Sequence, residues 1–311
     1  MRYIISSTLA TLLHATTVFA DVPRVVTDIP PVQSLVAMVM GDLGTPEVLV
    51  GQGADPHSFQ LRPSQAASLQ DATLIVWIGH QMTPWLERIL DGSGSTAMQI
   101  ELLNAAVTET IAYGEDTAHD HDTAPAEPAQ GGDQDAHDGL DPHAWLDPQN
   151  ATVWLSVIAA ELSTLDPANA AAYAANAAAA ATRIAALEAD IKTLLDPVTS
   201  KPFIVYHDAY NYFAGHFGLT LAGEIAIGDA TAPSAAQLAN LRETLITGSP
   251  VCIFPEANHD PKLLLQIAEG TPVNIGGVLD PEGASLQPGA DLYPALMRNL
   301  ATTLADCLTK S

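Results

Sequence analysis

Residues 166–197 read DPANAAAYAANAAAAATRIAALEADIKTLLDP, and this alanine-rich stretch predicts how the whole chain is organised. Four apolar residues recur at three- and four-residue spacing, as on one face of a helix: Ile184, Leu187, Ile191 and Leu194. Asp166 suits the N-cap, Pro167 suits the first helical position and Pro197 marks the end. Such a helix of about 28 residues would be roughly 42 Å long, which is enough to join two lobes.

Short apolar runs alternate with helical patterns on both sides of this stretch, which indicates parallel sheets with crossover helices. In the first half we expect strands at 24–27, 47–50 and 73–78, and helices at 31–40 and 63–69. In the second half we expect strands at 202–206, 219–222, 251–254 and 273–275, and helices at 209–217, 234–246, 261–268 and 292–308. The sequence therefore predicts an α/β fold of two parallel-sheet lobes: an N-terminal lobe over 21–165, a linking helix over 166–196 and a C-terminal lobe over 197–311.

The first residues have the features of a signal peptide for export. Arg2 supplies a positive charge, a short apolar stretch follows, and Val18-Phe19-Ala20 offers small residues for cleavage before Asp21. The apolar stretch is too short and too interrupted to favour a permanent membrane anchor. We expect residues 1–20 to be removed from an exported protein.

The charge of the chain limits its partners. It carries 36 Asp and Glu residues against 11 Lys and Arg, for a formal net charge of −25. Such an excess of negative charge argues against nucleic acid or an anionic membrane surface as a partner. Cations are the expected ligands.

The chain has two cysteines, Cys252 in an apolar run and Cys307 near the C-terminus. An even count in an exported protein favours one disulfide between them. Two buried free thiols are the alternative. The wide separation and the lack of a CxxC motif argue against a thiolate metal site.

Three histidines lie where ordered elements are expected to end. The tripeptide Asp-Pro-His occurs at 55–57 and again at 141–143, and His207 closes the apolar run 203–206. In open parallel sheets, ligands bind beyond the carboxyl ends of strands, and imidazole is the commonest protein ligand for zinc. Each histidine could instead be an ordinary surface or core residue, but the repeated context favours a metal site at His57, His143 and His207.

Residues 114–141 differ from the rest of the chain. They include nine acidic residues, no basic ones and three histidines, His119, His121 and His137. With almost no apolar content the segment cannot bury a core, so we expect a mobile loop. We favour a weak metal-binding or transfer role for its histidines over the alternative of a solvated acidic insertion.

These motifs resemble the cluster A-I family of periplasmic metal-binding proteins that serve ABC transporters, and most closely its ZnuA-like zinc-binding members. The resemblance covers essentially the whole mature chain and rests on four segments in the family's order: Gly53-Ala54-Asp55-Pro56-His57-Ser58-Phe59, Asp141-Pro142-His143-Ala144-Trp145-Leu146-Asp147-Pro148, Tyr206-His207-Asp208-Ala209-Tyr210 and Gly277-Val278-Leu279-Asp280-Pro281.

The resemblance implies two lobes bridged by one rigid helix, with zinc as cargo in the cleft between them. It places the ligands at His57, His143, His207 and Asp280, although water or another carboxylate could take the fourth position. A third imidazole favours Zn²⁺ over Mn²⁺, which prefers oxygen-rich sites. The implied partners are a membrane ABC permease and a periplasmic metal donor, for a monomeric protein that is not an enzyme.

Two other functions remain open from the sequence. Three histidines with one open position also describe a secreted zinc hydrolase, for which Glu256 is the best candidate base. A zinc-buffering or adhesion protein without a transporter is the other alternative. We interpret His80, His216 and His259 as structural, with His259 in a helix cap.

Overall fold

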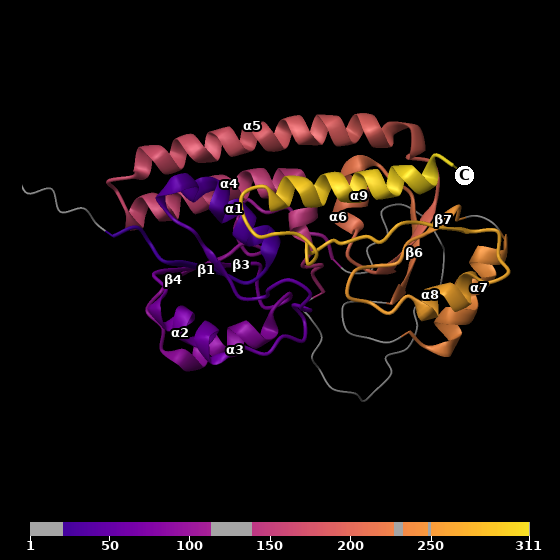
Figure 1. The fold of residues 1–311 in the computed structure, drawn as a ribbon, viewed down its shortest axis with the longest axis horizontal. Coiled ribbons are helices and arrows are strands. Elements are labelled where there is room, and N and C mark those ends of the chain that lie inside the picture. The colour runs from indigo at the N-terminus through magenta and orange to yellow at the C-terminus, as the bar shows by residue number, and fades with distance from the viewer. Residues whose placement is uncertain (1–20, 113–138, 227–232, 248–249, 311) are drawn as a thin grey trace, which may run out of the picture.

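Two four-stranded sheets, all of whose strands are parallel, form the framework of the protein (Figure 1). The computed structural model describes residues 21–112, 139–226, 233–247 and 250–310. The predicted signal peptide and the greater part of the acidic segment lie outside these residues. The fold class predicted from the sequence, two parallel-sheet α/β lobes, is confirmed.

The first sheet has the order β2-β1-β3-β4. Its elements in chain order are β1 (Val25–Thr27), α1 (Pro30–Met40), a 3-10 turn at Gly41–Leu43, β2 (Glu47–Val48), α2 (Pro63–Asp71), β3 (Leu74–Trp77), α3 (Pro84–Ser93) and β4 (Met98–Glu101). The sequence did not predict α3 or β4. Strand β4 lies at the sheet edge with Met98 and Gln99 exposed, so it lacks the apolar run that marked the central strands.

The second sheet has the order β6-β5-β7-β8. Its elements are β5 (Phe203–His207), α6 (Asn211–Phe217), β6 (Leu221–Ala226), α7 (Ala235–Thr247), β7 (Cys252–Ile253), α8 (Lys262–Ala268), β8 (Asn274–Ile275) and α9 (Leu292–Leu308). Between the two sheets, the chain forms a 3-10 turn at Ala144–Leu146, α4 (Pro148–Leu165), α5 (Ala170–Leu195) and a 3-10 turn at Asp196–Val198.

Helix α5 is the long helix expected from the alanine-rich stretch, and it runs along both lobes (Figure 1). Its first residue is Ala170 with Asn169 as N-cap, so the predicted start at Asp166 is wrong. Asp166 instead ends α4, and its Oδ2 accepts hydrogen bonds from Asn169 Nδ2 and the Tyr173 hydroxyl. A carboxylate that fixes the turn between two helices is therefore not available to cap the second.

One face of α5 is buried over its full length, which explains why so alanine-rich a helix is stable here. The buried residues are Tyr173, Ala177, Ala180, Ile184, Leu187, Ile191 and Leu195. Leu194, which we expected on this face, is 40% exposed, and Leu195 takes its place. The small alanines allow close approach of α1, α4 and α9, and one hydrophobic core includes residues of both lobes.

Helix α9 gives the lobes a second connection. It packs against α5 and against α1 of the first lobe. Tyr293 near its start donates its backbone N–H to Ser34 Oγ in α1 at 3.0 Å. At its other end Cys307 forms a disulfide with Cys252 in β7, as predicted. The division of the chain into lobes at 166–196 stays a prediction, since α9 belongs by sequence to one lobe and packs on the other.

None of the helices in the described ranges is both long and apolar enough to cross a membrane.

Binding of the zinc ion that the sequence resemblance implies should change the shape of the protein little. A wide hinge motion would have to break the packing of α5 and the α9–α1 contact together, whereas small lobe rotations and loop movements would not. We expect X-ray scattering profiles of the zinc-free and zinc-loaded protein to nearly coincide. A large decrease in radius of gyration on loading would show that α5 and α9 do not hold the lobes.

Removal of the disulfide should lower the free energy of unfolding. The link closes a loop with a sequence separation of 55 residues. In the chain-entropy model a loop of this size contributes about 4 kcal/mol. Denaturant unfolding of the Cys252→Ser/Cys307→Ser variant should give a lower midpoint than the oxidised native protein and match the native protein under reducing conditions. Equal midpoints in all three samples would contradict the prediction.

Candidate metal centre

The repeated Asp-Pro-His tripeptide forms the same local turn at both sites. Asp55 Oδ1 accepts the backbone N–H of His57 at 2.8 Å, and Asp141 Oδ1 accepts that of His143 at 2.9 Å. An aspartate that bonds the backbone two residues on makes a tight turn, and the intervening proline has a fixed φ. The motif therefore orients a histidine at the end of a loop with little backbone freedom.

His143 is fully buried between the lobes. Its Nδ1 lies 2.7 Å from Asp141 Oδ1, the atom that also accepts its backbone N–H. The other oxygen of Asp141 accepts a hydrogen bond from Asn211 Nδ2 of α6. With Nδ1 hydrogen-bonded to a carboxylate, Nε2 is the nitrogen that can act as a ligand, which is the arrangement typical of a metal-binding histidine.

His207 ends β5 and is held in the same way by another carboxylate. Its Nδ1 lies 2.6 Å from Glu256 Oε1, and Glu256 Oε2 accepts a hydrogen bond from the Tyr210 hydroxyl at 2.9 Å. Although burial raises the pKa of Glu256, the neighbouring His207 and His259 lower it to about 2. Glu256 is therefore an anion that fixes Nδ1 of His207 and directs Nε2 away from itself.

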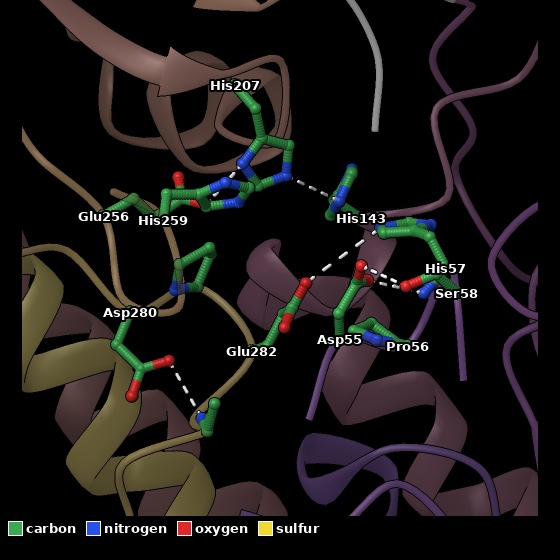
Figure 2. A network of polar contacts seen from close by, with 12 residues as sticks. Asp55, Pro56, His57, Ser58, His143, His207, Glu256, His259, Asp280 and Glu282 are labelled. Carbon is green, nitrogen blue, oxygen red and sulfur yellow. Dashed lines mark hydrogen bonds and ion pairs between the residues drawn. The ribbon is translucent and has the colours of Figure 1, made fainter. Parts of the chain in front are cut away.

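The Nε2 atoms of His143 and His207 converge to 3.4 Å, and Figure 2 shows His57 beside His143. The ring centroids are 5.2 Å apart for His143 and His207, and 6.1 Å apart for His57 and His143. In a tetrahedral zinc site with bonds of about 2.0–2.1 Å, ligand nitrogens lie about 3.3–3.4 Å apart. The structure thus brings together all three histidines singled out in the sequence: His57 from the loop between β2 and α2, His143 from just before the 3-10 turn at Ala144–Leu146 and His207 from the end of β5.

Asp280 is the expected ligand that the structure does not direct toward the histidines. Its carboxylate accepts backbone N–H groups of Ala284 at 2.9 Å and Ser285 at 2.8 Å, and the Ser285 hydroxyl. Figure 2 shows the side chain pointing away from the histidine cluster. Both oxygens of Asp280 stabilise the turn of its own loop.

Glu282, two residues further along this loop, is the carboxylate beside the histidines (Figure 2). Its Oε1 lies 4.0 Å from His57 Nε2, and its side chain is 14% exposed. Burial raises the pKa of the Glu282 carboxyl well above its usual range. A desolvated carboxyl at this position would gain from a cation between it and the imidazoles.

A hydrogen bond from Trp145, two residues after His143, holds the loop that carries Glu282. Trp145 Nε1 donates to the carbonyl of Pro281 at 2.8 Å, and the hydroxyl of Tyr293 in α9 donates to the carbonyl of Trp145 at 3.0 Å. Glu282 belongs to no motif that the sequence analysis recognised, and its only signal was its position two residues after Asp280.

The other histidines have different surroundings. His216 lies between Asp147 and Glu188, with nitrogen–oxygen distances of 2.9 and 3.0 Å, and His80 Nδ1 lies 3.4 Å from Glu101 Oε1. His259 is not in a helix cap, because α8 begins at Lys262 with Pro261 as its N-cap, so that expectation is wrong. Its Nε2 lies 3.3 Å from Glu256 Oε1.

The loop histidines His119, His121 and His137 lie outside the described residues, and their predicted role stays a prediction.

The family model described as ZnuA, "Zinc-uptake complex component A periplasmic", matches residues 25–307. Among curated proteins, the chain is similar to the high-affinity zinc uptake system protein ZnuA of Paracoccus denitrificans, with 47% identity over 93% of each chain. It is also similar to the protein of the same name from Brucella suis, with 37% identity over 92% of each.

Solved structures are also similar to this chain over most of its length. A crystal structure of ZnuA has 28% sequence identity and a TM-score of 0.74, and covers 92% of this chain and 99% of that one. A zinc-bound ZnuA with residues 138–173 deleted has 26% identity and the same TM-score, over 92% of this chain and 98% of that one. The laminin-binding adhesin Lmb of Streptococcus agalactiae has 26% identity and a TM-score of 0.73, over 92% of this chain and 99% of that one.

Proposed function

Because the chain belongs to the ZnuA family of periplasmic zinc-uptake components, we propose that it binds Zn²⁺ in the periplasm and delivers it to a membrane ABC permease. The ion is cargo, so the protein must hold it tightly and then release it unchanged to the permease. The family supplies a substrate-binding component of a transporter. We propose further that the protein acts as a monomer and receives zinc from the medium or from a periplasmic donor.

His57, His143 and His207 are the proposed zinc ligands. The observation that carries this proposal is the 3.4 Å separation of the Nε2 atoms of His143 and His207, which matches the edge of a zinc tetrahedron. The carboxylates bonded to both Nδ1 atoms support it, since such partners fix the tautomer and the ring orientation of a metal ligand. Three imidazoles suit Zn²⁺ better than Mn²⁺.

We propose Glu282 as the fourth ligand, with Asp280 as the alternative that the sequence resemblance favours. Glu282 supplies a carboxyl group with an oxygen 4.0 Å from His57 Nε2, whereas three hydrogen bonds within its own loop occupy Asp280. One carboxylate with three neutral imidazoles would leave a formal charge of +1 on the zinc site. A closed shell of four protein ligands also excludes the reactive water that a hydrolytic zinc keeps.

The hydrolase alternative would need Glu256 as its base. Its two oxygens are engaged by His207 and Tyr210, and it lies on the far side of His207 from the converging Nε2 atoms. A base must reach the metal-bound water directly or through one water. This geometry favours a carrier over a hydrolase.

Loss of the histidines should abolish tight zinc binding. Outer-shell partners alone are commonly worth about 10–100-fold in metal affinity, so replacement of a ligand should weaken binding by more than that. We expect His57→Ala, His143→Ala and His207→Ala each to lower zinc affinity in competition with a chromophoric chelator, and the triple variant to lose tight binding. His80→Ala, which alters a histidine–carboxylate pair elsewhere, is the control. Stoichiometric tight binding by the triple variant would refute the proposed site.

The two carboxylates can be separated by a matched pair of variants. Glu282→Gln should weaken zinc binding at least about tenfold and change the visible absorption spectrum of the Co²⁺-substituted protein, because a ligand atom is lost. Asp280→Asn should leave that spectrum as in the native protein, although a looser loop can lower affinity. The reverse pattern of spectra would identify Asp280 as the ligand.

A further inference from the structure

A second cluster of ligand atoms lies on the other face of His207. His207 Nδ1, a Glu256 oxygen and His259 Nε2 all lie within 4.8 Å of one another. Glu256 Oε1 is the centre of the cluster, 2.6 Å from His207 Nδ1 and 3.3 Å from His259 Nε2. Two imidazole nitrogens around one carboxylate are a donor set that suits Zn²⁺. We refer to Glu256, His259 and Nδ1 of His207 as the outer cluster.

The outer cluster leads from solvent to the three converging histidines. The His259 side chain is 37% exposed, whereas that of Glu256 is 3% exposed and that of His207 is 4% exposed. His207 belongs to both places, because its Nε2 faces His143 and its Nδ1 faces Glu256 (Figure 2). An ion held at the exposed edge would be one imidazole away from the inner position.

Local structure holds His259 in place. Asn258 has a φ of 65°, the only positive value outside glycine among the described residues, and it closes a turn in which His259 N–H donates to the Glu256 carbonyl at 3.4 Å. A non-glycine residue in this region is uncommon and marks a position set by its surroundings. The His259 ring stacks on Tyr206, with centroids 4.3 Å apart and an interplanar angle of 29°.

The base of this turn is tied to the loop of the inner site. Glu256 forms a parallel bridge with Leu279, and the N–H of Ala257 donates to the carbonyl of Leu279 at 2.8 Å. Asp280 and Glu282 follow directly. The position of His259 is therefore coupled through a few residues to the carboxylates beside His57.

We propose that the outer cluster is a capture site for Zn²⁺, from which the ion moves to the inner histidines; this rests on the proposed zinc-carrier function. The ion first binds His259 Nε2 and Glu256. When His207 Nδ1 joins, its proton leaves to solvent and Nε2 takes one up, so the ring stays neutral. When the ion then moves to Nε2 of His207, Nε2 gives up its proton, and Nδ1 takes one up again and donates to Glu256. The two sites share His207, so full occupancy of one excludes full occupancy of the other.

Two multiply substituted forms of the protein serve as backgrounds for the test. In both, His119, His121 and His137 are replaced by alanine, so that the acidic segment contributes no histidine. The first retains the inner site, and the second adds His57→Ala and His143→Ala to disable it. Circular dichroism checks that each folds. The probe is Zn²⁺ alone, followed by calorimetry in the disabled background and by the rate of transfer from a chromophoric chelator in the intact one.

His259→Phe is the informative variant, because phenylalanine keeps a ring to stack on Tyr206 but has no ligand atom. In the disabled background, His259→Phe should abolish the weak binding of one Zn²⁺ ion that calorimetry otherwise detects. With the inner site intact it should leave affinity nearly unchanged and slow zinc uptake by about tenfold, the low end of what a focused charged cleft gives to association rates. His80→Phe, on a 29% exposed histidine that also contacts a carboxylate, should change neither quantity.

The capture site would be overturned if His259→Phe kept both the weak zinc binding of the disabled background and the zinc uptake rate of the intact one. A loss seen in His259→Ala and restored in His259→Phe would overturn it as well, since this would assign His259 a stacking role only. Failure of the zinc-carrier proposal looks different: the disabled background would then still bind zinc tightly, whatever residue stands at 259.

Discussion

The packing of α5 and α9 across both sheets is the constraint on which the candidate metal centre depends. His57 comes from the loop between β2 and α2, His143 from just before the 3-10 turn at Ala144–Leu146 and His207 from the end of β5. No local sequence brings these side chains together. The buried face of α5, the contact of α9 with α1 and the disulfide between α9 and β7 fix the relative positions of the lobes, and only then can two Nε2 atoms converge to 3.4 Å.

Carboxylates set the chemistry around these histidines. Asp141 and Glu256 each hold the Nδ1 of one imidazole, which makes Nε2 the nitrogen that would bind a metal. Asp280 acts on the backbone instead and shapes the loop that presents Glu282. The acidic residues of the chain thus act locally in three ways: they orient histidines, they shape a loop and they place a carboxyl group beside His57.

The sequence predicted the architecture and singled out the three histidines that the structure brings together, because both depend on local patterns. Alternating apolar runs identify parallel strands, and the Asp-Pro-His turns are made within three residues. What it could not give depends on distant contacts. Leu194 and Leu195 are adjacent apolar residues, and the packing of the neighbouring helices determines that Leu195 is the buried one. Likewise, Asp280 and Glu282 are both acidic residues of one loop, and the choice between them depends on which direction its turn takes.

That turn bears on how the proposed carrier would use Glu282, a loop residue, as a ligand. A carboxylate on β5 or α6 would be as fixed as His207, and release of the ion would then require movement of the sheet. Glu282 instead belongs to a loop that hydrogen bonds to the first lobe, where Gly53 N–H donates to the carbonyl of Ala284 at 3.1 Å and Gln52 Nε2 to that of Leu286 at 2.6 Å. A partner that separates these loops by a small rotation would withdraw the carboxylate and leave three neutral imidazoles around a doubly charged ion. Loss of that one negative charge weakens the site without unfolding any helix, so the lobes can stay together while the ion leaves.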